Sequence, residues 1–263
     1  MWQSKPVLVL LLLAVSTAAT LGKPLLTKIT KGGASTALYT APLSAGRPLV
    51  LDLSAPAITT PCSGQTTKVT LPAHSTDGSN PLSPVSFAAT ATCAAAPSGT
   101  IGVAGLARSS ASFPAPGGQH AEGGQLLRSD VSRPFITAFD RAMGSSAKVA
   151  AVAPFELCYD SSKLSPTRSG YSVPQVDVML EGGTNFTVVG GNSMAQVNSG
   201  TACFAFVQAG GGTAGGTPAV VIGGFQMESK LVVLDNDKKT LSFTPYLPAM
   251  GFSCGNFNFT RAG

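Results

Sequence analysis

The sequence predicts a mainly β protein of two lobes with only a few short helices. Its 263 residues include 30 glycines and 19 prolines, which cut the chain into short segments, as in all-β folds rich in turns. Helical periodicity is confined to one stretch, residues 130–143. A short apolar run broken by glycines occurs in each half, at residues 100–106 and 220–224, which indicates a duplicated architecture.

Composition excludes several classes of protein. Hydrophobic residues make up 44% and charged residues 11% of the chain, the opposite of the balance that keeps a chain disordered. The net charge of +5 is thinly spread, without a block of like charges, so a nucleic-acid partner is not expected. No stretch after the N-terminal segment is long and apolar enough to cross a membrane.

Residues 1–22 have the form of a secretory signal peptide. Lys5 supplies a positive charge, residues 7–15 are an apolar run too short to span a bilayer, and small residues follow. We expect cleavage between Ala18 and Gly22 and a mature chain that begins near Lys23. The alternative is that the apolar run is a buried β-strand. A signal peptide predicts secretion to the extracellular space.

Each element of the mature chain follows from a local pattern. Phe135, Ile136, Phe139 and Met143 recur at helical spacing, and Asp130 is expected to cap this helix. Residues 231–234 and 240–243 flank a polar turn and predict a hairpin. β-branched and aromatic residues between turn signals predict strands at 49–53, 84–92, 176–180, 185–189, 201–207, 219–222 and 230–235. Residues 109–124 and 208–217 have the composition of linkers.

Cysteines, histidines and sequons agree with an extracellular protein. The five cysteines should oxidise, and their odd number keeps one thiol outside intrachain disulfides. No C-x-x-C spacing exists and the only histidines are His74 and His120, so no metal site is expected. No glycine-rich stretch has the spacing of a nucleotide motif, so no cofactor is expected. Asn185 and Asn258 begin sequons for glycosylation.

Several motifs, in order, carry a family resemblance. Asp52 ends an apolar run, 48–51, where an ionised carboxylate needs partners. The motifs are STALYT (35–40) before LVLDL (49–53), TIGVAGL (100–106), VAPFELCYD (152–160), NSM (192–194) before GTAC (200–203), AVVIGGFQME (219–228) and CGNFNFT (254–260). Together they resemble the plant pepsin-like aspartic peptidases. The wheat-type xylanase inhibitors and basic 7S-globulin-like proteins are the nearest branch.

The resemblance implies a pepsin-like bilobal fold that is incomplete in this chain. Residues 23–115 resemble the xylanase-inhibitor N-terminal lobe and residues 116–263 the C-terminal lobe. The resemblance also implies the disulfides Cys158–Cys203 and Cys62–Cys93, which leaves Cys254 outside them. A Cys93–Cys254 disulfide remains an alternative, because five cysteines do not fix their connectivity.

The chain departs from the peptidase pattern at the catalytic positions. A working aspartic peptidase needs two carboxylates that share one proton, each in a D-T/S-G turn. Asp52 matches the first position, but Leu53 and Ser54 stand where Thr and Gly are needed. The strand for the second turn is missing after Gly124. A further block looks absent after Cys62. We therefore expect Asp52 to be vestigial and the chain to lack peptidase activity.

The resemblance points instead to binding. The xylanase inhibitors insert a loop histidine between the two catalytic carboxylates of a microbial glycosidase, a favourable contact between a cation and acids. The matching residues here are Leu247, Pro248, Ala249 and Met250, and Ala249 stands at the place of the histidine. His74 and His120 lie in polar stretches and do not replace it.

The function expected from these residues is that of a secreted, non-catalytic, xylanase-inhibitor-like defence protein of the apoplast or cell wall. Its partner would be a microbial endo-xylanase or another cell-wall glycosidase, and its inhibition would be weakened by Ala249. Two alternatives remain open. The chain could be an aspartic endopeptidase, or a truncated product without function.

Overall fold

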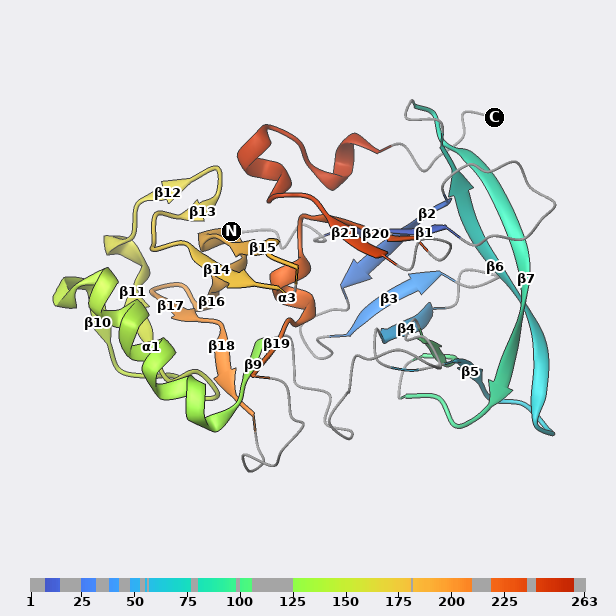
Figure 1. The fold of residues 1–263 in the computed structure, drawn as a ribbon, viewed down its shortest axis with the longest axis horizontal. Helices are drawn as coiled ribbons and strands as arrows, with labels where there is room; N and C mark the ends of the chain where they lie inside the picture. Colours follow the sequence, from blue (N-terminus) through green and yellow to red (C-terminus); the bar gives the residue numbers. More distant parts are fainter. Residues whose placement is uncertain are drawn as a thin grey trace. The chain divides into compact units, whose positions relative to one another are not determined.

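The computed structural model describes residues 8–14, 25–31, 38–42, 48–52, 55, 57–76, 80–97, 100–105, 125–180, 182–209, 219–235 and 240–257 (Figure 1). The chain divides into two compact units. Unit 1 comprises Met1–Ala115, Ser229–Thr244 and Ser253–Gly263, and unit 2 comprises Pro116–Glu228 and Pro245–Phe252. Two late segments of the chain therefore complete the first unit.

Unit 1 is built around one ten-stranded sheet. Its order is β21-β20-β1-β2-β3-β4-β8-β5-β7-β6. The strands are β1 (Leu8–Ala14), β2 (Leu25–Lys31), β3 (Tyr39–Pro42), β4 (Pro48–Asp52), β5 (Ile58–Thr60), β6 (Thr66–Ser75), β7 (Ser83–Cys93), β8 (Val103–Gly105), β20 (Leu231–Asp235) and β21 (Thr240–Phe243). The mainly β prediction is confirmed.

Seven of these strands close into a ring, because one edge of β2 pairs with two strands. The C-terminal end of β2 pairs with β3, and its N-terminal end pairs with β6 through Leu25↔Ser75 and Leu26↔His74. The ring runs β2-β3-β4-β8-β5-β7-β6 and back to β2. Closure satisfies backbone groups that an open edge would expose.

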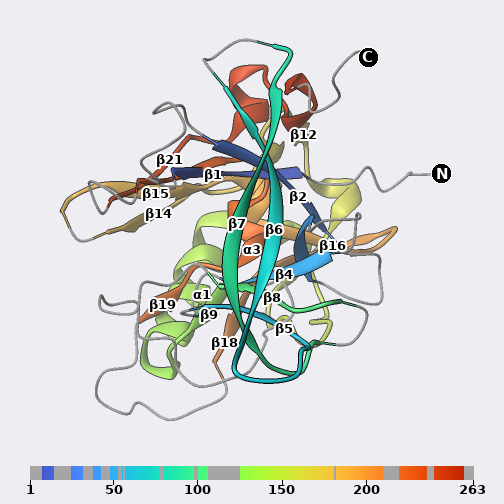
Figure 2. The same ribbon diagram turned by 90° about the vertical axis from the view of Figure 1, so that its right-hand side faces the viewer.

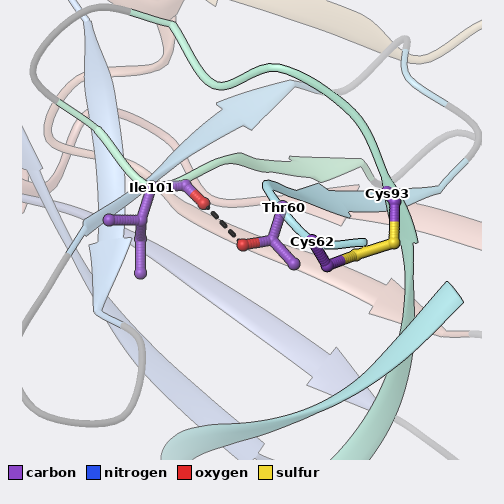
Figure 3. The surroundings of a disulfide bond; sticks show 4 residues. All are labelled: Thr60, Cys62, Cys93 and Ile101. Atoms are coloured by element: carbon purple, nitrogen blue, oxygen red, sulfur yellow. Dashed lines mark hydrogen bonds between the residues drawn. A yellow bond between two sulfur atoms is a disulfide. The ribbon is translucent and has the colours of Figure 1, made fainter. Parts of the chain in front are cut away.

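The longest ladder of unit 1 joins β6 to β7, which cross the view as two long ribbons in Figure 2. The predicted strand 84–92 is confirmed within β7, whereas β6 was not predicted. A disulfide joins Cys62 to Cys93 at the end of β7. Beside it the Thr60 hydroxyl donates to the carbonyl of Ile101 at 2.8 Å (Figure 3). These links hold the β5 end of the ring together.

The N-terminal apolar run is a strand in the intact chain. β1 pairs antiparallel with β2 and parallel with β20. Its removal between Ala18 and Gly22 stays a prediction.

The predicted hairpin near the C-terminus is confirmed as β20 paired with β21. Val232 of β20 is buried together with Ile29 of β2, and Tyr39, Leu51 and Phe243 pack against this pair. The cluster therefore joins the hairpin to β2, β3 and β4 through side chains as well as through the sheet.

The described residues of unit 2 form four small sheets and most of the helical turns. Their orders are β10-β11-β17-β16, β18-β9-β19, β12-β13 and β14-β15. The strands are β9 (Gln125–Leu127), β10 (Lys148–Val149), β11 (Cys158–Asp160), β12 (Pro166–Thr167), β13 (Gly170–Tyr171), β14 (Val176–Met179), β15 (Asn185–Val188), β16 (Met194–Asn198), β17 (Thr201–Phe204), β18 (Phe206–Gln208) and β19 (Val220–Val221). The helices are α1 (Ser129–Met143), α2 (Gly190–Ser193) and α3 (Gly224–Met227), with 3-10 turns η2 (Ser145–Ala147), η3 (Ser161–Lys163) and η4 (Leu247–Met250); η5 (Cys254–Asn256) belongs to unit 1.

The predicted helix is confirmed as α1, and its apolar face packs on β17 and β18. Phe139 stacks on Phe204 with ring centroids 3.7 Å apart, and Phe135 lies 4.9 Å from Phe206. This aromatic cluster is part of the core of the unit. The expected cap was wrong: Arg128 is the N-cap, and Asp130 lies in the first turn.

The predicted strand 201–207 is two strands in the structure. Ala205 interrupts it, because the Ala205 N–H donates to the carbonyl of Ser193 at 2.8 Å. β17 then pairs with β11 and β16, whereas β18 pairs with β9. The remaining predicted strands, including β14 and β15, lie within one or two residues of their expected bounds.

Lys230 is a charged side chain in the interior, at only 1% exposure. Its Nζ donates to the carbonyl of Thr244 at 3.4 Å. Burial lowers the pKa of Lys230 to about 8. The folded chain thus loses this proton at a lower pH than the unfolded chain, and the cost of burying the charge is fully present below pH 8.

We predict that Lys230→Met stabilises the protein at pH 6 and not at pH 10.5. The gain should approach ~3 kcal/mol at pH 6, the equivalent of the pKa shift, and disappear as the pH rises through 8 toward 10.5. Urea unfolding at both values measures it, with exposed Lys68→Met as the control. An equal gain at both pH values would contradict this account of Lys230.

Candidate functional site

Asp52 lies at the end of β4, beside the glycine-containing strand β8. The two strands are parallel, and Asp52 is in register with Gly105. The carboxylate is half-buried, and its Oδ1 accepts a hydrogen bond from the Ala55 N–H at 3.1 Å. Asp52 is therefore hydrogen-bonded to Ala55, three residues beyond it.

The glycines of the 100–106 motif are required by backbone contacts. A Cβ at Gly102 would lie 1.9 Å from the carbonyl oxygen of Thr59, and one at Gly105 would lie 2.2 Å from that of Ala57. Gly102 also has a φ of 145°, which side chains rarely adopt. These contacts bring β5 against β8 and so shape the surroundings of Asp52.

The second catalytic position can be judged only from the sequence. Residues 106–124, just before its expected place, lie outside the described residues. Within the described part, β9 leads through Arg128 directly into α1. Asp130 accepts hydrogen bonds from the Arg128 guanidinium at 2.6 and 3.0 Å, which lower the pKa of that carboxyl. Asp130 thus stabilises a helix start, and the missing second aspartate stays a prediction.

The predicted binding residues form part of a loop, residues 245–252, that is held firmly on unit 2. A Cβ at Gly191 would lie 2.2 Å from the Tyr246 hydroxyl oxygen, so the Tyr246 ring sits directly over a glycine. Leu247 is buried. The Phe252 N–H donates to the carbonyl of Leu247 at 3.0 Å, and Gly251 is left-handed. The loop is therefore anchored at its start by Tyr246 and Leu247, and the hydrogen bond between Phe252 and Leu247 closes it on itself.

The 245–252 loop presents apolar side chains to solvent. Met250 is 44% and Phe252 58% exposed. Ala249 is also exposed, whereas Pro248 is half-buried. Phe252 was not among the predicted binding residues, because the family pattern directs attention to the place of the histidine. The signal available in the sequence was an aromatic residue, preceded by Gly251, two positions after the predicted four.

The structure pairs the cysteines as the resemblance implies. It contains Cys62–Cys93 and Cys158–Cys203, and the second joins directly opposite residues of β11 and β17. Cys254 is buried and belongs to neither disulfide. Asn185 is exposed at the start of β15. Asn258 lies outside the described residues, as does His120.

Two features are absent from the described residues. No group of three or more metal-ligating side chains occurs among them. No helix in this part of the chain is long and apolar enough to cross a membrane.

The comparisons with known proteins place the chain. Residues 124–245 match the family described as xylanase inhibitor C-terminal, and this match ends where the 245–252 loop begins. The chain is 33% identical to the chitinase CLP of Oryza sativa subsp. japonica, with 92% of each protein covered. It is 34% identical to the "Probable aspartic proteinase GIP2" of Nicotiana benthamiana, over 51% of this chain and 30% of that protein.

Solved structures show the same fold at low identity. A structure titled edgp superposes with a TM-score of 0.74 at 17% identity, over 99% of this chain and 100% of that one. Conglutin gamma, a basic 7S globulin from lupine seeds, gives 0.66 at 18% identity, over 98% and 100%.

The alignment with the rice chitinase is longer than the chain itself. It runs over 395 residues, whereas this chain has 263. The relative thus contains segments without a counterpart here. Because the chain nevertheless covers that relative almost end to end at 33% identity, it belongs to the plant pepsin-like family that includes the xylanase inhibitors and basic 7S globulins.

Proposed function

We propose that the chain is a secreted, non-catalytic binding protein of the plant cell wall that docks on microbial glycosidases through its 245–252 loop. The observation that carries the proposal is that loop itself, anchored by Tyr246 and Leu247 and exposing Met250 and Phe252. It directly follows the segment that matches the xylanase inhibitor C-terminal family. A rigid loop that presents apolar side chains is a good docking element, because little conformational freedom is lost on binding.

A non-catalytic role is supported by the chemistry around Asp52. Peptide hydrolysis by this family needs two carboxylates that share a proton. The carboxylate of Asp52 accepts a hydrogen bond from the Ala55 N–H, and the two residues that follow it in the sequence, Leu53 and Ser54, depart from the catalytic pattern. Asp130, the first acidic residue after the expected second position, pairs with Arg128.

The loop chemistry defines the kind of contact that binding would use. Residues 245–252 read PYLPAMGF and carry no charge. Met250 and Phe252 would pack against aromatic side chains of the glycosidase cleft, whose ordinary role there is to contact the faces of sugar rings. A loop without a histidine forgoes a charge-assisted hydrogen bond of about 1.5–3 kcal/mol, so binding would be roughly ten- to a hundredfold weaker than with one.

A second candidate function comes from the name of one relative. The rice protein is called a chitinase, so chitin hydrolysis is the enzymatic alternative. Glycoside hydrolysis ordinarily needs a pair of carboxyl groups about 5–10 Å apart. Release of sugar from chitin by the purified chain alone would favour this alternative.

We predict that replacing both Met250 and Phe252 with serine weakens binding to a sensitive endo-xylanase at least about tenfold, because buried apolar anchors carry much of the affinity of an interface. Ala249→His should strengthen inhibition by about tenfold or more. Calorimetry measures binding, and xylan hydrolysis measures inhibition.

Met179→Ser is the matched control, since Met179 is 77% exposed on the same unit but outside the loop. Equal losses from the control and the loop variants would reject the loop as the docking element. An absence of binding to every xylanase and chitinase of a microbial panel would reject the proposed function.

We predict that Asp52→Asn leaves peptide hydrolysis at the background level of the wild-type chain across pH 2–7. It should also cost little stability, because the amide oxygen can still accept from Ala55. Asp52→Ala should cost about 1 kcal/mol, the usual value of a lost local side-chain acceptor. Pepstatin-sensitive cleavage by the wild-type chain that vanishes in Asp52→Asn would establish the endopeptidase instead.

A further inference from the structure

β1 occupies a slot between two strands that are far apart in the chain. It pairs antiparallel with β2, from Leu8↔Thr30 to Leu13↔Leu25. On its other edge it pairs in parallel with β20, from Leu10↔Leu231 to Ala14↔Asp235. Among the described strands, β1 alone joins the β20–β21 hairpin to the rest of the sheet. Figure 1 shows these strands together.

Contacts that do not involve β1 hold both sides of the slot. The far edge of β2 is paired with β3 and β6, and the far edge of β20 is paired with β21. Ile29 of β2 and Val232 of β20 are buried in one cluster. The Leu231 N–H donates to the Thr244 hydroxyl at 2.9 Å. Each side of the slot thus keeps its own outer pairings, and the cluster around Ile29 and Val232 is the contact that holds β20 near β2 when β1 leaves.

An empty slot would expose two rows of backbone donors and acceptors in the interior of a sheet. Such groups are costly to leave without hydrogen bonds and are readily satisfied by an added strand. Residues 8–14 read LVLLLLA, without a charge or a proline, so the occupant seen here is an extended apolar segment.

We propose that β2 and β20 form an acceptor for an extended apolar strand, which Leu8–Ala14 fills in the intact chain. After removal of the predicted leader, the acceptor takes up an apolar strand of another polypeptide, antiparallel to β2 and parallel to β20. Recognition is through the backbone ladder, so the occupant needs about six uncharged residues without proline.

The reactivity of the Cys254 thiol can report whether β1 is in the slot. It lies in η5, which contacts β1, and it is the one cysteine outside both disulfides. It is only 5% exposed, and burial raises the pKa of its thiol to about 11. Departure of β1 would uncover the thiol and return it toward its ordinary reactivity.

The test uses the full chain with a specific protease site inserted between Gly22 and Lys23, folded first and then cut. The 1–22 segment should stay with the body in native gel filtration. In Leu11→Pro, which removes a ladder donor from the middle of β1, the segment should leave, and alkylation of Cys254 at pH 8 should accelerate about tenfold or more. Leu11→Val keeps the donor and is the matched control.

Two further measurements keep the proposal falsifiable if Leu11→Pro does not fold. In the uncut wild-type chain, amide exchange in β2 and β20 should be slow. A labelled peptide of residues 6–16 with lysines at both ends should replace the cut segment and slow alkylation of Cys254 again, whereas the same peptide with proline at position 11 should not.

Four results would overturn the proposal. The first three are equal binding of the proline peptide, fast exchange in β2 and β20 of the uncut chain, and release of the cut wild-type segment with Cys254 still protected. Dimerisation of the cut body that excludes the peptide would also overturn it, because the acceptor would then belong to a second copy.

Discussion

Backbone pairing between segments that are distant in sequence is the interaction on which unit 1 depends. The described residues of the unit form no long helix that could satisfy its own peptide groups, so most of their N–H and C=O groups find partners on another strand. β2 illustrates the demand, because β1 covers one of its edges while β3 and β6 share the other. The closed ring of seven strands and the place of β1 between β2 and β20 both follow from this need for backbone partners.

Unit 2 meets that constraint differently. Its sheets are small, and its stability rests on α1, whose phenylalanines stack on Phe204 and Phe206, and on the disulfide between β11 and β17. The binding loop we propose depends on this rigidity, since Tyr246 can lie over Gly191 only where the backbone is fixed and free of a side chain. The packing of unit 2 thus positions the exposed apolar loop.

The sequence predicted the elements whose patterns are local. The period of Phe135 and Phe139 specified α1, and the polar turn before Thr240 specified the last hairpin. It did not predict β6, because Thr66–Ser75 alternates threonines and other polar residues with few large apolar ones, and its stability comes from pairing with β7. Nor could it show that Ala205 divides a strand, since a hydrogen bond to Ser193 decides this.

The candidate site was accessible from sequence only where the family pattern was present. Asp52 and the loop near Ala249 were found through that pattern. The exposure of Phe252 and the burial of Leu247 depend on how the loop turns at Gly251. Such a distinction between anchor and contact residue is a property of packing, which residue types alone do not specify.

The discontinuity of unit 1 has a consequence for its biosynthesis. The hairpin that completes the unit, β20–β21, leaves the ribosome only after the 113 residues Pro116–Glu228 have been made. At about 5–20 residues per second, the early strands wait on the order of ten seconds for their last partners. During that interval the early strands of unit 1 lack the hairpin, and unit 2 can fold only in part, because its own last segment, Pro245–Phe252, is made after the hairpin.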